Sequence, residues 1–310
     1  MKLLKSRVGR ITLEFGVALA IILALSLDVF RLNLIDQEIH IKGFTDDGIT
    51  QSRVASRMFV DDLSADYDSE VAIEINIPAT EMRLYENGEE LFMRKVAVGQ
   101  GRYPTPERDS QIELIEWNPW WFPPKSRWAR KDKPTPPGPR NPLGPVKLRV
   151  GKHSEILLHG TNKSWSVGRA ASHGCMRMHN SEAKSIAWYL QEKFSKKNNP
   201  DLLDTYRDRS RSTFRVKLEK PIPIKLVYRL IEVRDNNLVF YPDVYKKFHG
   251  NKKAVVLTEL LSNGYEIDML DDAKVEALSS NWPSKRSEIP IEELLMDPPS
   301  SDFLDAPECS

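Results

Sequence analysis

Cysteine is scarce in this chain: its 310 residues include only two, Cys175 near the middle and Cys309 beside the C-terminal residue. A disulfide between them is disfavoured, because Cys309 belongs to an acidic terminal segment that offers little to hold the geometry of such a bond. In an oxidising compartment cysteines are usually paired, so an internal cysteine without a partner there is kept mainly for its chemistry. Cys175 is therefore a candidate functional residue.

The chain also lacks an excess of charge of either sign, since it contains 45 Lys and Arg residues and 44 Asp and Glu residues, which gives a net charge of +1. This balance has none of the excess of basic residues that nucleic-acid binding requires, so nucleic acids are excluded as partners. The chain also shows no internal repeat and no alternation of strands with helices. A solenoid and a doubly wound parallel sheet are disfavoured accordingly.

Long apolar runs are missing outside the N-terminal region, where four basic residues (Lys2, Lys5, Arg7 and Arg10) precede the apolar run 15–27. This pattern predicts that residues 1–36 form an uncleaved signal anchor or a cleaved signal peptide; a buried soluble helix is a further alternative. Residues 37–69 are polar and are expected to form a stalk. We expect an exported body on the periplasmic or cell-wall face, tethered to the inner membrane by the anchor.

Strand patterns begin at Val71, where every second residue up to Ile77 is apolar, as in a half-buried strand. Asn87-Gly88 separates two such runs and predicts a hairpin, because a type I′ turn needs positive φ at both positions. Further strands are expected at 111–116, 146–150, 156–158 and within 214–241. The Pro-rich stretch 119–145 is too irregular for regular structure.

One helix is expected after Asn180, the predicted N-cap, with an apolar stripe at i, i+3, i+4, i+7 and i+11 (Ala183, Ile186, Ala187, Leu190 and Phe194). Residues 195–212 are charged and are expected to form a loop. The body is thus predicted to be a mostly β domain over 70–245 with one helix. Residues 246–310 are predicted to be a C-terminal extension whose acidic tail, from Ser287, is disordered.

The segment "SHGCMRM" (172–178) surrounds the internal cysteine with groups suited to nucleophilic catalysis. A thiol reacts as thiolate, and either His173 or His159, at the end of an apolar strand, could take its proton. Gly174 permits an unusual backbone angle, so that consecutive N–H groups of the turn could point at an oxyanion. Arg177 alternates with two core methionines and suits a substrate carboxylate; a structural contact with the loop is the alternative.

A metal site is the competing hypothesis, since His159, His173, Cys175 and His179 are acceptable ligand types. Their spacing matches no zinc signature, and two ligands separated by a single glycine rarely bind the same ion. We therefore expect neither a metal nor an organic cofactor.

Several motifs in order resemble the YkuD-type L,D-transpeptidase family. The stretch "HGTNKSWSVGRAASHGCMRMHN" (159–180) is similar to its signature, His-Gly-Thr, a short loop and Ser-x-Gly-Cys-x-Arg. "RLYENGEE" (83–90), "VAVGQGRYPTP" (96–106), "WNPWWFPP" (117–124) and "PPGPRNPLG" (136–144) resemble further segments of the family. The resemblance covers about residues 70–245. It implies the family's mostly β fold of sandwich-like mixed sheets with one helix after the catalytic loop.

The resemblance also implies roles for individual residues. Cys175 matches the nucleophile and His159 the general base. Three residues, Ser172, His173 and Gly174, match the loop that supports the nucleophile and the oxyanion. Arg177, Gly160, Thr161 and Asn180 are expected at the substrate, and the Thr161 hydroxyl could orient the base. Trp120 and Trp121 are expected to wall the cleft or stack on a sugar, with packing under the loop as the alternative.

The activity implied by the resemblance is peptidoglycan L,D-transpeptidation. A Cys175 thioester would form with a tetrapeptide stem, release D-alanine and pass the acyl group to an amine. That amine would belong to a second stem peptide, in cross-linking, or to a wall-anchored lipoprotein. Hydrolysis of the same kind of bond, as an L,D-carboxypeptidase or endopeptidase, is the first alternative. A non-catalytic peptidoglycan-binding module is the second.

Overall fold

A computed structural model of the chain describes residues 70–151 and 156–296. The expected N-terminal anchor 1–36, the stalk 37–69 and Cys309 lie outside these ranges. Within the described ranges, no helix combines the length and the apolar character that a bilayer crossing demands.

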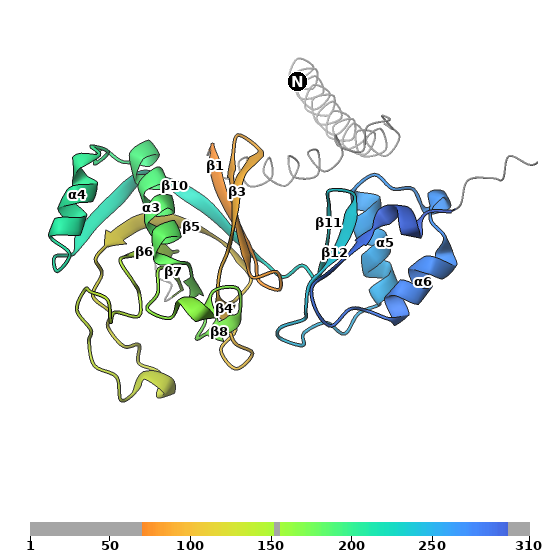
Figure 1. Cartoon of the computed structure of the whole chain (residues 1–310), viewed down its shortest axis with the longest axis horizontal. Coiled ribbons are helices and arrows are strands. Elements are labelled where there is room, and N and C mark those ends of the chain that lie inside the picture. Colours follow the sequence, from red (N-terminus) through yellow and green to blue (C-terminus); the bar gives the residue numbers. More distant parts are fainter. Residues whose placement is uncertain (1–69, 152–155, 297–310) are drawn as a thin grey trace, which may run out of the picture. The chain divides into compact units, whose positions relative to one another are not determined.

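An eight-stranded mixed sheet forms the main body, in the order β3-β2-β1-β10-β5-β6-β7-β9 (Figure 1). Its strands are β1 (Val71–Asn76), β2 (Glu81–Glu86), β3 (Glu89–Lys95), β5 (Arg108–Trp117), β6 (Val146–Val150), β7 (Leu157–His159), β9 (Met176–Arg177) and β10 (Phe214–Val227). Two neighbouring pairs, β1 with β10 and β7 with β9, are parallel, and the other pairs are antiparallel. A separate parallel pair joins β4 (Val98–Gly99) to β8 (Ala170–Ser172).

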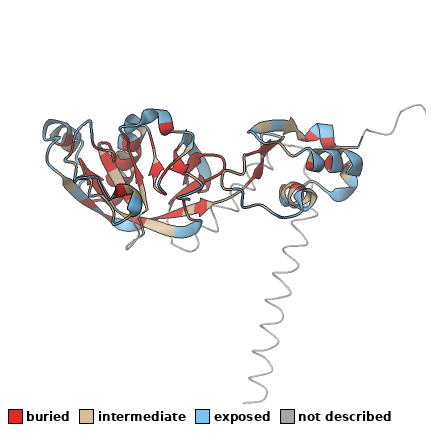
Figure 2. Cartoon of the chain, turned by 90° about the horizontal axis from the view of Figure 1, so that it is seen from below, coloured by how far each residue is buried: buried red, intermediate tan, exposed pale blue. Residues whose placement is uncertain are grey.

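The hairpin between β2 and β3 forms at Asn87-Gly88 as predicted, with φ angles of 50° and 85°. Strand β1 differs from the half-buried strand expected, because all six of its residues are buried. Its neighbours β2 and β10 flank it on both sides, and its polar residues Glu74 and Asn76 contact charged groups rather than water. The buried strands of the sheet appear in red in Figure 2.

Helix α3 (Asn180–Phe194) begins where the sequence predicts and packs against β6 and β10. All five residues of the predicted stripe are buried. The N-cap is His179 instead of Asn180, since the Asn180 side chain is engaged elsewhere. The expected loop 195–212 contains a further helix, α4 (Asp201–Asp208), whose buried Tyr206 stacks on Trp117 with ring centroids 4.8 Å apart.

The C-terminal residues form a second core. Strands β11 (Ile231–Arg234), β12 (Asn237–Phe240) and β13 (Ser287–Pro290) pair in a three-stranded sheet that packs with α5 (Lys252–Ser262) and α6 (Asp272–Ser280). The structure therefore differs from two expectations. Residues 231–240, placed in the catalytic domain, belong to this second sheet, and residues 287–296, expected to be disordered, include β13 and the buried Ile291 and Leu294. Acidic composition is compatible with order here because the segment also contains apolar side chains, of which Ile291 and Leu294 are buried.

The predicted fold class is confirmed. The described residues are mostly β, in mixed sheets, with a helix directly after the segment that carries Cys175. Short 3-10 helices supply the remaining regular structure, and the Pro-rich stretch contains one of them, η1 (Arg127–Ala129).

Candidate active site

Three adjacent strands place the candidate catalytic residues on one face of the large sheet. Lys147 on β6 pairs with His159 on β7, and His159 pairs with Arg177 on β9, so the three form one row across the sheet. Residues paired in this way point to the same face. Cys175 immediately precedes β9, and continuing the register by one residue places it beside Leu157. The nucleophile candidate and the base candidate therefore belong to adjacent rows of neighbouring strands.

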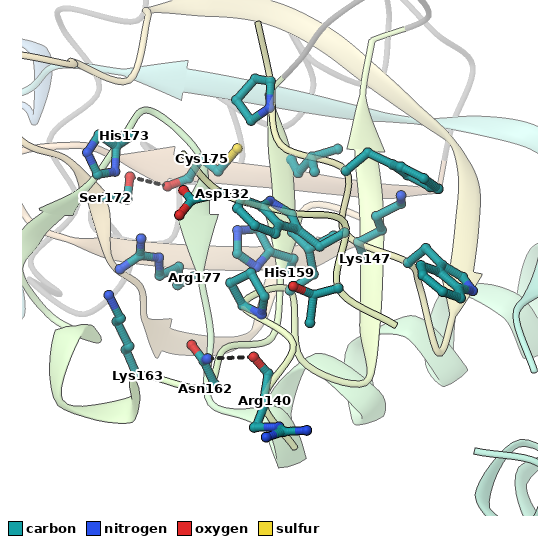
Figure 3. Close-up of a pocket in the computed structure, with 18 of the residues that line it drawn as sticks. Asp132, Arg140, Lys147, His159, Asn162, Lys163, Ser172, His173, Cys175 and Arg177 are labelled. Carbon is teal, nitrogen blue, oxygen red and sulfur yellow. Dashed lines mark hydrogen bonds between the residues drawn. The ribbon is translucent and has the colours of Figure 1, made fainter. Parts of the chain in front are cut away.

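These residues line a cavity of about 580 Å³. Cys175, His159, Ser172, His173 and Arg177 are all part of its wall, and Figure 3 shows them around one opening. The Pro-rich stretch forms the opposite wall through several aromatic side chains. The thiol of Cys175, the imidazole of His159 and the guanidinium of Arg177 thus line one cavity.

His159 is buried, with 4% of its surface exposed. Its Nδ1 lies 2.5 Å from the carbonyl oxygen of Gly160, and because a carbonyl can only accept, Nδ1 carries the proton. Nε2 is then the basic nitrogen. Burial, together with the positive charge of Arg177, lowers the pKa of His159 to about 3, so the ring is neutral at neutral pH. A neutral imidazole can accept a proton.

The turn before Cys175 is held by its own hydrogen bonds. Gly174 has φ of 109°, a backbone conformation that other residues adopt only with strain. The buried Ser172 hydroxyl donates to the carbonyl of Cys175 at 2.5 Å and accepts from the N–H of Gly174 at 3.0 Å. The Gly174 N–H, expected to help bind an oxyanion, is therefore committed to the turn itself.

Arg177 is partly buried beside the cysteine, and its side chain reaches Ser166 Oγ at 3.3 Å and the carbonyl of Ala171 at 3.5 Å. Within residues 70–151 and 156–296 it forms no ion pair with a carboxylate. Burial lowers its pKa, while the nearby Cys175 acts in the opposite direction. A guanidinium with only weak neutral partners can take a carboxylate ligand.

His173 is an exposed residue whose ring stacks on Trp128, with centroids 4.0 Å apart and planes at 16°. Tyr103 contacts it at 4.8 Å with a 47° tilt. Partial desolvation of the ring lowers its pKa, and the neighbouring cations Arg177 and Lys163 lower it further. The ring therefore joins the cysteine loop to the Pro-rich stretch, a contact between aromatic rings that complements the loop support expected for it.

Trp120 and Trp121 both lie in the cavity wall. Trp120 is 41% exposed and stacks with Phe122, whereas the backbone of Trp121 pairs with Thr135. The buried Asn141 amide donates to the carbonyls of three residues of this stretch (Pro119, Thr135 and Pro136). These bonds give an irregular segment a defined path, which lets it serve as a wall.

Gly160, Thr161 and Asn180, expected at the substrate, do not line the cavity. Asn180 Oδ1 accepts from the N–H of Thr161 at 2.7 Å, and the Thr161 hydroxyl accepts from the N–H of Lys163 instead of orienting the histidine. A Cβ on Gly160 would lie 2.5 Å from the same Asn180 oxygen. The contacts of these three residues join the start of helix α3 to the end of the histidine strand.

Thr105 is a site residue that sequence reasoning missed. It is buried, and its hydroxyl donates to the carbonyl of Gly174 and accepts from the N–H of Gly99, both at 2.8 Å. Its own N–H donates to the Tyr245 hydroxyl at 2.9 Å. The only signal in the sequence is its place in the "YPTP" segment, because 69 residues separate it from Gly174.

The four candidate metal ligands do not come together in the structure. His179 caps helix α3, is exposed and does not line the cavity that holds His159, His173 and Cys175. In the part of the chain that the structure describes, no three His, Cys, Asp or Glu side chains are grouped as metal ligands.

A cysteine, a buried neutral histidine and an arginine around one cavity are the groups that an acyl-transfer enzyme with a cysteine nucleophile uses. Comparison with known proteins agrees with this class. Residues 70–199, less than half of the chain, match the YkuD family, described as an L,D-transpeptidase catalytic domain.

Two relatives from Escherichia coli strain K12 are named probable L,D-transpeptidases, YbiS and ErfK/SrfK. Each is 32% identical, over 123 and 125 residues, or 36% of this chain. The chain spans about 40% of the length of these curated relatives. Among solved structures, an L,D-transpeptidase from Mycobacterium smegmatis is 17% identical with a TM-score of 0.31, covering 51% of this chain and 58% of that one.

Proposed function

We propose that the protein is a peptidoglycan L,D-transpeptidase that acts through a thioester on Cys175. The observation that carries the proposal is the placement of Cys175 and the buried, neutral His159 in the same cavity. The family of residues 70–199 supports the reaction type. The basic segment and apolar run before residue 28 support export to the compartment where stem peptides occur.

In the first half-reaction, His159 Nε2 takes the proton of the thiol, and the sulfur attacks the carbonyl that precedes the terminal D-alanine of a tetrapeptide stem. The C–S bond forms, the C–N bond breaks, and the same proton passes from His159 to the departing amine of D-alanine. Neutral His159 suits this step, because a histidine already protonated could not accept the proton.

In the second half-reaction, the amine of an acceptor attacks the thioester, and His159 removes a proton from that amine. A new amide forms, and the proton returns to the Cys175 sulfur as the C–S bond breaks. The acceptor is a second stem peptide in cross-linking or an amine of a wall-anchored lipoprotein. Arg177 holds a substrate carboxylate beside the reacting carbonyl.

A purified tetrapeptide muropeptide tests the proposal. Incubation with the full chain should give D-alanine and a cross-linked dimer by mass spectrometry, and Cys175→Ala should abolish both products, while Cys309→Ser should leave them unchanged. Tripeptide without dimer would show a hydrolase instead. Full activity of Cys175→Ala would overturn the thioester mechanism.

A further inference from the structure

The cavity is electropositive. Among the described residues that line it, five are basic (Arg140, Lys147, Arg149, Lys163 and Arg177) and one, Asp132, is acidic. In Figure 3, Arg177 and Lys163 lie on one side of His159 and Lys147 lies on the other. Basic side chains are therefore present on both sides of the base, beyond the single arginine that the sequence motif contains. A ligand with carboxylates on both sides of the reacting carbonyl matches this distribution.

Arg149 and Lys147 project from the same face of β6, two positions apart, but differ in their partners. Lys147 pairs with Glu116 at 2.8 Å, so its charge is largely compensated. Within the described part of the chain, the side chain of Arg149 forms no ion pair or hydrogen bond, and its Nε is buried without a partner. An unpaired buried N–H of a guanidinium is unfavourable unless a ligand supplies the acceptor.

The register of the sheet places Arg149 relative to the nucleophile. Arg149 pairs with Leu157, and Leu157 is level with Cys175 when the β7–β9 register is continued by one residue. Two strand spacings then separate the Cα atoms of Arg149 and Cys175, about 10 Å. An arginine side chain bridges much of that distance, and both residues line the same cavity. Its guanidinium can thus meet a group on a peptide whose carbonyl lies at the Cys175 sulfur.

We propose that Arg149 binds a carboxylate of the acyl-donor peptide, on the opposite side of His159 from the carboxylate that Arg177 holds. This inference rests on the proposed function for the identity of the donor and adds a specificity determinant to it. The substrate class is a stem peptide that keeps free carboxylates on both sides of the attacked carbonyl. Amidation of the carboxylate that meets Arg149 would weaken binding.

The test compares two tetrapeptides, one with free carboxylates and one with every carboxylate except the terminal one amidated. We expect Arg149→Gln to raise KM for D-alanine release from the free-carboxylate peptide, since one charged hydrogen-bonding pair contributes roughly 10- to 100-fold. The amidated peptide should show little change. Lys217→Gln is the matched control, because exposed Lys217 borders a second cavity with Arg149 but does not line the first.

A binding measurement separates this inference from the proposed function. In the Cys175→Ala background, titration calorimetry should show the same preference for the free-carboxylate peptide, and Arg149→Gln should remove it. If the unsubstituted protein released no D-alanine but the preference depended on Arg149, the proposed function would fail and the inference would stand. If Arg149→Gln left the preference intact, or if Lys217→Gln removed it equally, the inference would be overturned.

Discussion

His159 illustrates how burial sets the chemistry of one residue. Its pKa of about 3 lies well below the ordinary value of 6.5, because burial and the charge of Arg177 disfavour the imidazolium. Between these two values the unfolded chain takes up a proton on this histidine and the folded protein does not. The neutral ring therefore contributes to stability above about pH 6.5, and that contribution is lost as the pH falls toward 3.

We expect the free energy of unfolding to fall between pH 6 and pH 4, with this histidine contributing a slope of up to about 1.4 kcal/mol per pH unit. Urea unfolding of the unsubstituted protein and of His159→Gln at several pH values measures this slope. Carboxylates that titrate in the same pH range are present in both proteins, so the difference between the two slopes reports the histidine. The slope should be shallower in His159→Gln. Equal slopes in the two proteins would show that the folded histidine titrates normally.

Thr105 is a positioning residue at the same scale. Removal of its hydroxyl leaves the N–H of Gly99 and the carbonyl of Gly174 without a partner next to the cysteine turn. We expect Thr105→Val, which keeps the side-chain shape, to lower kcat for D-alanine release on the order of 10- to 100-fold, because small displacements of a nucleophile have large effects.

Rescue distinguishes positioning from general destabilisation. Thr105→Ser keeps the hydroxyl and should restore most of kcat, while KM should change little in either variant. The melting temperatures of Thr105→Val and Thr105→Ser show whether the two variants differ in stability. If both lost kcat equally, the hydroxyl would have no part in placing Cys175.

At the scale of elements, the site depends on three short strand segments and one irregular wall. Strands β6, β7 and β9 bring Lys147, His159 and Arg177 into one row, and hydrogen bonds from Asn141 fix the Pro-rich stretch opposite them. Sequence periodicity predicted the strands at 146–150 and 156–158 closely. It did not predict the row, since alternation shows which face a residue occupies and not which strand lies beside it.

In helix α3, too, the buried face could be predicted from the sequence and a contact with a distant segment could not. Its stripe of apolar residues was predicted correctly, because a 3.6-residue period directly records the buried face. The hydrogen bond of the Asn180 side chain was not predicted correctly. This side chain could cap its own helix or bind a distant loop, and in the structure it accepts from the N–H of Thr161. Where a polar side chain has two possible hydrogen-bond partners, the segment that packs next to it determines which of them it binds.

At the scale of the whole molecule, buried ion pairs join the large sheet to the C-terminal core. Arg83 on β2 contacts Glu232 on β11 at 2.5 Å and Glu74 on β1 at 3.3 Å, and all three side chains are largely buried. Asn76 and Tyr241 donate further hydrogen bonds to Glu232. Burial alone would raise the pKa of Glu232, but the charge of Arg83 lowers it overall, so this carboxylate stays ionised.

We expect Glu232→Gln to lower the free energy of unfolding by about 3–5 kcal/mol, because it leaves Arg83 with an incompletely compensated buried charge. Urea unfolding measures the loss. Glu288→Gln is the control, since Glu288 pairs with Arg286 in solvent and exposed pairs contribute about 1 kcal/mol or less. A loss of the same size in both variants would indicate that the buried network has no special role.

Two tyrosines that follow β10 in the sequence and pack against the main core also support the active site through hydrogen bonds. The Tyr245 hydroxyl accepts from the N–H of Thr105, and the N–H of Tyr245 donates to the Tyr228 hydroxyl. Residues 228–245 lie beyond the segment 70–199 that matches the catalytic family. Part of the support of the cysteine turn therefore comes from outside the family domain.

The sequence by itself determined the features that depend on near neighbours along the chain: the Asn87-Gly88 hairpin, the α3 stripe, the cysteine motif and the buried methionines on either side of Arg177. Only the tertiary structure decided which nitrogen of His159 is basic, that Thr105 supports the turn, and that the side chain of Arg149 has no partner within the described residues. These properties depend on burial and on contacts between distant segments. Local composition and periodicity do not encode them, because they record what a residue is and which face it occupies, not what the folded chain places beside it.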